Sequence, residues 1–320
     1  MKTRFFVLLF ILFGVYSCKN ETGVSEDVSK IRINLAVIRF DKQFAEANPG
    51  DIPLLKNEFP YLFPKQYSDS VWIAKLNDTL QKELYSEVNE EFPDFTRETE
   101  DLELLFRHIM YYFPNYKVPK VITVISDVDY SNRVILADSL LLIGLDNYLG
   151  KDHRFYGGIE QYIAAGLDKD YLISDVASAF NRTRLRFPSD RTFLAQMIYY
   201  GKELYLKDML MPLATDAQKI VYTTEELEWA QANEEQIWRY FIEREILYST
   251  DNMLAPRFLD PAPFSKFRLE LDNESPGRLG RYMGWQIVRA FMNNNEVKLN
   301  QLLELSAEEI FKKSNYKPKK

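Results

Sequence analysis

Val121-Ile122-Thr123-Val124-Ile125 and Arg133-Val134-Ile135-Leu136-Ala137 are two β-rich runs, separated by the polar segment 126–132. β-Branched residues favour strands, so this stretch predicts a hairpin or an adjacent pair of strands. Residues 140–145 extend the second run or form a third strand. A further half-buried strand is predicted where apolar residues alternate with polar or small ones, at Ile31, Ile33, Leu35 and Val37.

Patterns typical of helices occupy most of the remaining chain. The expected helices are a segment from Asp41 to the Pro49-Gly50 break, 68–91, 97–113, one from a Ser189-Asp190 cap through residue 205, a long one behind the capping-box pair Thr223 and Glu226, one opened by Ser275-Pro276, and a short one capped by Ser306 and Glu309. No repeat of 20–50 residues and no Gly/Ser linker divides the chain. The sequence therefore predicts one α+β domain over residues 31–320, predominantly helical with a small sheet.

Composition excludes several kinds of chemistry. The 320 residues carry 40 Lys and Arg against 47 Asp and Glu, a formal charge of −7, which argues against a broad nucleic-acid-binding face. A single Cys excludes a disulfide framework and a multi-thiolate metal site. Two His exclude any site that needs three imidazoles.

The first thirty residues have the features of a bacterial lipoprotein signal. Lys2 and Arg4 precede a short apolar run that ends in Tyr16-Ser17-Cys18, and this is the only Cys of the chain. A small residue directly before a Cys marks the position where the thiol receives a diacylglycerol and becomes the new N-terminus. We therefore predict a signal peptide over residues 1–17 and lipid attachment at Cys18.

Residues 18–30 are polar and are expected to form a flexible tether. Two or three fatty acyl chains, such as palmitate, anchor a protein stably, so the domain is expected to hang from a membrane of the cell envelope. Lys19 follows the Cys, where an Asp would favour retention in the inner membrane. This favours the outer membrane.

No sequence motif for catalysis, metal binding or cofactor binding is found. Of the two His, His108 is expected in a core or interface and His153 on the surface without a role. Asp127 and Asp129 could form an acid–base pair, but carboxylates on a turn more often cap backbone amides. We expect Gly280-x-x-x-Gly284 to let another backbone pack closely. The pairs Tyr111-Tyr112 and Tyr199-Tyr200 are either partner-binding or core aromatics.

Five segments resemble the gliding motility lipoprotein GldB family, and the resemblance covers the whole chain. They are the signal with Cys18, Ile38-Arg39-Phe40-Asp41, the 146–152 segment Asp146-Asn147-Tyr148-Leu149-Gly150-Lys151-Asp152, Met197-Ile198-Tyr199-Tyr200-Gly201-Lys202, and Arg281-Tyr282-Met283-Gly284-Trp285-Gln286-Ile287-Val288. The resemblance implies a role in gliding and in assembling or delivering the surface machinery for it. It does not imply a biochemical activity.

The body is also similar to zinc peptidases of the gluzincin-like type, in which a central helix carries His-Glu-x-x-His. On that analogy the central helix corresponds to residues 193–208, and Met197, Ile198 and Gly201 stand at the positions of the two His and the Glu. None of the three can bind zinc or activate water. The analogy implies a degenerate peptidase scaffold whose groove, where it remains, binds without cutting.

The leading hypothesis is a non-catalytic, lipid-anchored adaptor or assembly factor. Its partners are the membrane, through the lipid on Cys18, and other envelope proteins of the gliding apparatus; no nucleic acid and no cofactor is expected. Two alternatives stay open. One is an envelope hydrolase that uses a carboxylate pair, and the other is a ligand-binding lipoprotein that feeds a transporter.

Overall fold

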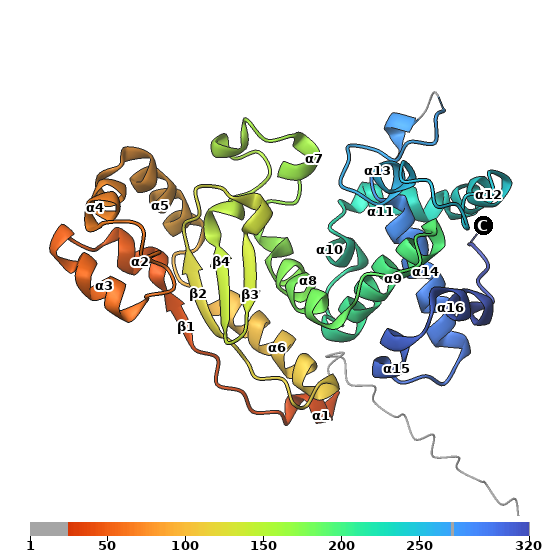
Figure 1. Ribbon diagram of the computed structural model, residues 1–320, viewed down its shortest axis with the longest axis horizontal. Coiled ribbons are helices and arrows are strands. Elements are labelled where there is room, and N and C mark those ends of the chain that lie inside the picture. Colours follow the sequence, from red (N-terminus) through yellow and green to blue (C-terminus); the bar gives the residue numbers. More distant parts are fainter. Residues whose placement is uncertain (1–24, 270–271, 320) are drawn as a thin grey trace, which may run out of the picture.

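The computed structural model of the protein describes residues 25–269 and 272–319. The predicted signal peptide and Cys18 lie outside the described residues. The described chain is mostly helical and contains one small mixed sheet, which confirms the predicted α+β class. Figure 1 shows an α/β half built around the sheet and a helical half, with α8 and α9 between the sheet and the rest of the helices.

The sheet has the strand order β1-β2-β4-β3 (Figure 1). β1 (Val37–Arg39) and β4 (Leu140–Gly144) flank β2 (Lys120–Val124) as parallel partners, and β3 (Val134–Ala137) is the antiparallel neighbour of β4. The predicted pairing of the first two β-rich runs is therefore wrong, because β4 lies between them. Its uninterrupted apolar sequence suits a central position, whereas β3 alternates between half-buried and exposed residues at the edge.

Helices cover both faces of this sheet. The helices of the α/β half are α1 (Glu26–Ser29), α2 (Phe40–Ala45), α3 (Ile52–Glu58), α4 (Asp69–Asn77), α5 (Thr79–Glu91), α6 (Thr96–Tyr112), α7 (Gln161–Ala164) and α8 (Leu172–Arg184). On one face Val121 and Leu141 pack in a core with α6 and α8, and on the other Ile122 packs with Phe59 and Phe63 beside α2 and α3. Successive side chains of a strand point to opposite faces, and this alternation assigns them to the two cores.

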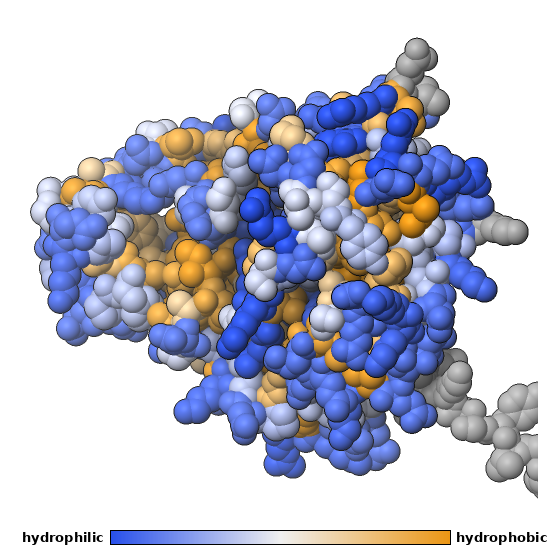
Figure 2. Space-filling view, turned by 45° about the vertical axis from the view of Figure 1, so that its right-hand side comes forward, coloured by the Kyte–Doolittle hydropathy of each residue, from blue (hydrophilic) through white to orange (hydrophobic). Residues whose placement is uncertain are grey.

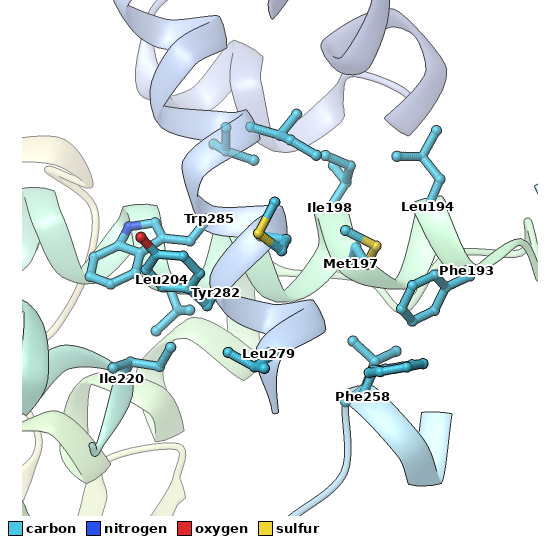
Figure 3. Close-up of a cluster of buried hydrophobic side chains, with 14 of the residues drawn as sticks. Phe193, Leu194, Met197, Ile198, Leu204, Ile220, Phe258, Leu279, Tyr282 and Trp285 are labelled. Carbon is cyan, nitrogen blue, oxygen red and sulfur yellow. The ribbon is translucent and has the colours of Figure 1, made fainter. Parts of the chain in front are cut away.

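The helical half packs around one buried pair of helices. Its elements are α9 (Phe193–Leu210), α10 (Asp216–Ile220), α11 (Thr224–Ala232), α12 (Glu234–Glu243), α13 (Leu254–Phe258), α14 (Leu279–Asn294), α15 (Leu299–Glu304) and α16 (Ala307–Ser314). Figure 3 shows α9 and α14 crossing among buried side chains, with α13 contributing Phe258.

The α9–α14 crossing depends on two glycines. A Cβ at Gly201 would overlap the backbone of Gly284, and a Cβ at Gly284 would overlap the carbonyl group of Met197. Only glycine lets two backbones approach this closely. The expectation of close backbone packing at the second glycine of Gly280-x-x-x-Gly284 is confirmed; Gly280 itself packs against Leu259 and Phe258.

A half-buried ion cluster ties the C-terminal end of α9 to α10 and α14. Asp208 accepts hydrogen bonds from the Arg289 guanidinium at 2.6 and 2.7 Å, from Lys219 Nζ at 3.0 Å and from Trp285 Nε1 at 2.8 Å. Arg289 also binds Asp216. Each charge in this cluster faces an opposite charge, which compensates for its partial desolvation.

Several predicted boundaries need correction. The alternating residues 31–36 are not a strand; Ile33 and Leu35 instead pack on the core beneath α6. The predicted helix 68–91 breaks at Asp78, whose carboxylate caps α5 by accepting from the Gln81 amide. The long helix after Thr223 breaks at Asn233.

Helix starts are partly as predicted. Thr223 and Ser306 cap α11 and α16 as expected. α9 is capped by Thr192 instead of Ser189-Asp190. α14 begins at Leu279, not at Ser275-Pro276, because the Ser275 hydroxyl is engaged by the carbonyls of Ser265 and Asp272 in the preceding loop.

The end of the predicted tether is part of the fold. Residues 26–29 form α1, in which Val28 is buried. Ser25 caps this short helix by accepting from the Val28 amide. The folded body thus begins before residue 31, the boundary that the sequence suggested.

Candidate functional site

A polar cleft of about 450 Å³ lies between the α/β half and the helical half. Its lining comes from the segment before and at the start of β3, from α8 and α9, and from the start of α14. Figure 2 shows hydrophilic side chains gathered across the middle of the molecule, between hydrophobic areas to either side. Six basic residues and two acidic ones line the cleft: Arg133, Arg182, Lys207, Lys219, Arg278 and Arg281 against Asp175 and Glu203.

Helix α9 supplies one wall of the cleft through the spacing of its residues. Tyr199, Tyr200, Glu203 and Lys207 follow one another at intervals of one, three and four residues, which keeps them along one side of a helix. The Tyr199 ring lies 5.0 Å from the ring of Phe187, whose side chain is 61% exposed. The cleft therefore opens to solvent over an aromatic rim.

Part of the charge in the cleft is neutralised within the protein. Arg133 forms a two-pronged ion pair with Asp175, with N–O distances of 2.6 and 2.9 Å, and the hydroxyl of Tyr148 donates to the same carboxylate at 3.0 Å. Glu203 accepts from the Ser178 hydroxyl at 2.8 Å. Both acidic side chains of the cleft are thus already engaged.

Three arginines of the cleft have no acidic partner among the described residues: Arg182, Arg278 and Arg281. Arg281 stacks on the Tyr200 ring at 3.9 Å from its centroid, and its Nε donates to the carbonyl of Leu259. Arg278 donates to the carbonyl of Val221 at 2.6 Å. Carbonyls orient these guanidinium groups without neutralising them.

Lys207 adds a fourth, buried cation beside the arginines. Its Nζ donates to the Ser174 hydroxyl and the Lys219 carbonyl, both at 2.9 Å, while the Glu203 carboxylate lies 3.7 Å away. Burial lowers the pKa of Lys207, and repulsion from Arg278 and Arg281 acts in the same direction. Burial, and then the charge of Arg278, also lowers the pKa of Arg281.

This arrangement is suited to binding an anion. Like charges that are held close together and partly desolvated raise the free energy of the empty site, and a bound anion relieves that repulsion. Guanidinium groups bind carboxylates and phosphates with two parallel hydrogen bonds, and those of Arg278 and Arg281 are already oriented by carbonyls and by an aromatic ring.

The candidate acid–base pair of the sequence does not form. Asp127 accepts from Lys75 at 2.9 Å and from the Gln81 amide, while Asp129 caps a 3-10 turn by accepting from the Asn132 amide. Both carboxylates therefore serve the loop between β2 and β3, and Asp129 plays the expected capping role.

The two histidines lie apart and have separate surroundings. His108 is buried on α6, as expected, and burial lowers its pKa. His153 is not a free surface residue as predicted, because its Nε2 lies 3.3 Å from a carboxylate oxygen of Glu87 on α5. Among residues 25–269 and 272–319, no group of three or more His, Cys, Asp and Glu side chains could hold a metal ion.

The three positions that the peptidase analogy singled out lie in the α9–α14 core. Met197 and Ile198 are buried (Figure 3). A Cβ at Gly201 would overlap the backbone of α14. The face of α9 that would carry metal ligands in a zinc peptidase is packed against another helix. The open cleft lies along other residues of the same helix.

Sequence reasoning missed the arginines of the cleft. Arg281 stands inside one of the segments that carried the family resemblance, and Tyr200 inside another, so the two segments that resemble the family meet in this contact. Asp41, also inside such a segment, is a buried carboxylate held by Arg39 at 2.7 and 2.9 Å. The sequence signal that could have identified these residues is a charged residue next to an aromatic one within such a segment, as in Phe40-Asp41 and Arg281-Tyr282.

The chain matches one known protein family. The family described as gliding motility protein GldB matches residues 21–318. The chain belongs to the GldB family. No curated protein and no solved structure matches the chain.

Membership in the GldB family confirms the resemblance found in the sequence. The family is one of gliding motility lipoproteins, so this GldB protein has a role in gliding and is associated with the cell envelope through a lipid anchor. Within the described residues, no helix has both the length and the apolar character needed to cross a bilayer.

Proposed function

We propose that this GldB protein is a non-catalytic adaptor, anchored by lipid on Cys18 to the outer membrane, that holds an acidic segment of another envelope protein of the gliding machinery in its basic cleft. The observation that carries the proposal is the set of three cleft arginines without an acidic partner among residues 25–269 and 272–319. An acidic peptide segment supplies the carboxylates that these arginines lack.

The shape of the cleft supports a chain segment as the ligand. The exposed Phe187 and the half-buried Tyr199 and Tyr200 give apolar surface next to the arginines. Tyr and Arg are the residues that most often dominate the binding energy of protein interfaces. Interface arginines next to tyrosines thus fit a protein ligand better than a lone inorganic anion.

The same contacts weigh against the hydrolase alternative. General acid–base catalysis needs a carboxyl group that can exchange a proton with a substrate. Asp175 is held by Arg133 and Tyr148, and Glu203 by Ser178. We therefore assign both carboxylates to shaping the cleft.

The degenerate peptidase scaffold is a second part of this proposal. It is supported by the central position of α9 in the helical half. Superposition of the α9–α14 pair on the central helices of zinc peptidases tests it. Matching helix directions and connections support the relation, and a different connectivity contradicts it.

Site-specific photo-cross-linking in gliding cells tests the adaptor function. A photoreactive phenylalanine analogue at Phe187, on the rim of the cleft, is expected to form an adduct with an envelope protein of the gliding apparatus. The matched control is the same analogue at Leu54 on α3, which is similarly exposed, 64% against 61%, but lies outside the cleft. It is expected to give no such adduct.

Two further variants complete the experiment. Arg278→Glu is expected to abolish the adduct from position 187, because it reverses one of the charges that bind the partner. Cys18→Ala is expected to release the protein from membranes and to lose the adduct. Identical adducts from both analogue positions, or an adduct that survives Arg278→Glu in a folded protein, would contradict the proposed function.

A further inference from the structure

A second, largely apolar pocket of about 270 Å³ lies at the carboxyl ends of β1 and β2, far in the fold from the basic cleft. It is lined by α2, by Leu62 and Phe63 of the segment before α4, by α4 itself, and by α5. Figure 2 shows hydrophobic side chains lining a hollow in the half that contains the sheet and these helices. Its apolar wall includes Phe40, Phe44, Phe63, Trp72, Leu76 and Val124.

The wall of this pocket is a packed aromatic cluster. The rings of Phe63 and Trp72 lie 4.7 Å apart and edge to face, and Phe40 contacts Phe63 at 5.9 Å in the same manner. Such edge-to-face contacts hold the rings in fixed orientations. The hollow is therefore formed in advance of any ligand.

The one acidic residue in the lining is not available to a ligand. Asp41 is 2% exposed, and its carboxylate binds the Arg39 guanidinium in a two-pronged pair and accepts from the Thr123 hydroxyl. Its charge is thus neutralised from the side of the protein. A cationic ligand would find no free carboxylate in this part of the lining.

The rim carries one ammonium group without an acidic partner. Lys75 pairs with Asp127 at 2.9 Å, and the Tyr85 hydroxyl donates to Glu46 at 3.3 Å. Lys82, the remaining basic residue of the lining, forms no ion pair within the described parts of the chain. The pocket thus combines an apolar interior with the ammonium group of Lys82, which has no ion pair with a described residue, at its edge.

We infer that this pocket binds a single-chain alkyl carboxylate, with its chain against Phe63 and Trp72 and its carboxylate at Lys82. At about 30 Å³ for each water-sized group, the volume accommodates a chain of roughly nine carbons. The ligand class follows from complementarity: an apolar body matches the wall, and an anionic end matches the ammonium group of Lys82. This site is separate from the basic cleft and does not depend on the function proposed for it.

Calorimetric titration of the mature chain, residues 18–320 with Cys18→Ser, tests the inference with a series of straight-chain carboxylates. Affinity is expected to rise about fourfold for each added methylene from pentanoate to nonanoate, because each buried CH₂ contributes a similar transfer free energy. Beyond the capacity of the pocket the increase is expected to stop. Nonanol is expected to bind more weakly than nonanoate, and nonylamine more weakly still.

Variants assign the binding to this pocket. Ala45→Trp and Leu76→Trp fill the hollow from two sides and are expected to abolish binding. Two separate variants are used so that the test does not fail if one of them does not fold. Lys82→Ala is expected to weaken nonanoate three- to fivefold while leaving nonanol unchanged. The control, Lys117→Ala, removes an exposed lysine that precedes β2 and is expected to change neither.

Three results would overturn the inference. They are the absence of binding by nonanoate at millimolar concentration, equal affinity for nonanoate and nonylamine, and unchanged binding in both filled variants. None of these results bears on the basic cleft, whose test uses a different probe and different residues.

Discussion

Two sides of the single helix α9 have opposite physical characters. On one side Met197 and Gly201 are buried and pack against the backbone of α14. On the other, Tyr199, Tyr200 and Glu203 face a cleft that contains arginines with no acidic partner in the described part of the chain. The first side fixes the helix in place, and a rigid helix is what a binding site on the second side needs. The comparison separates residues that stabilise this protein from residues that we assign to its function.

The largest expected effect is on the packed side. Gly284→Ala places a Cβ against the carbonyl of Met197, and the backbone of α9 cannot move aside without disturbing the core. We expect the free energy of unfolding to fall by about 3 kcal/mol or more, at the upper end of overpacking effects. Urea denaturation followed by circular dichroism measures it.

Gly158→Ala is the matched control, because no atom lies within 4 Å of the added Cβ. Its unfolding free energy is expected to stay within about 0.5 kcal/mol of the parent protein. An equally small change in the free energy of unfolding for Gly284→Ala would contradict the close crossing of α9 and α14.

A slightly smaller effect is expected at the paired charges of α9. Asp208→Asn removes the carboxylate shared by Arg289 and Lys219 and leaves both cations half-buried or buried without their central partner. Breaking such a pair costs about 3 kcal/mol. Thermal unfolding is expected to show a clear loss, in contrast to substitution of the unpaired arginines in the cleft. Equal losses at both places would remove the distinction between structural and functional charges.

A pH-dependent effect is expected at Lys202, which lies on α9 and donates to the carbonyls of Leu303 and Leu305. Burial lowers its pKa to about 8. Between about pH 8 and the ordinary pKa of lysine near 10.4, the unfolded chain holds this proton and the folded protein does not, so stability rises with pH. Lys202→Met is expected to remove this rise. The measurement is the melting temperature of the parent protein and of the variant, each determined as a function of pH over this range. An identical pH profile would contradict the assignment.

The smallest effect on stability is expected in the cleft. Arg182 is exposed and has no ion pair with a described residue, so Arg182→Glu should change the free energy of unfolding by less than about 0.5 kcal/mol. The same substitution is expected to reduce the yield of the photo-adduct that the analogue at position 187 forms with the partner protein. A loss of stability without a loss of the photo-adduct would show that Arg182 stabilises the fold and does not bind the partner, contrary to the comparison.

The sequence predicted the parts of the structure that depend on local pattern. The capping residues Thr223 and Ser306, the apolar run that forms β4 and the glycine at 284 could each be identified from a few neighbouring residues. The lipid site at Cys18 rests on a local pattern of the same kind. The family resemblance supplied the role in gliding.

The rest depended on contacts between distant segments. The apolar run of β4 is compatible with a central strand, but which strands it separates depends on the assembly of the whole sheet. The helix α8 was missed although Leu172, Val176 and Phe180 recur at helical spacing. The cleft assembles Arg278 and Arg281 of one half with Tyr130 and Arg133 of the other. Their missing carboxylate partners are visible only when all neighbours in space are known.

Gliding of cells that carry Arg182→Glu with Arg278→Glu tests the central claim most directly, with Arg32→Glu and Arg97→Glu as a control of equal charge change outside the cleft. Both proteins are first shown to be folded and bound to membranes. We predict that the cleft variant stops gliding and loses the photo-adduct from position 187, while the control retains both. Normal gliding and an unchanged adduct in the cleft variant would show that the unpaired arginines do not bind the partner.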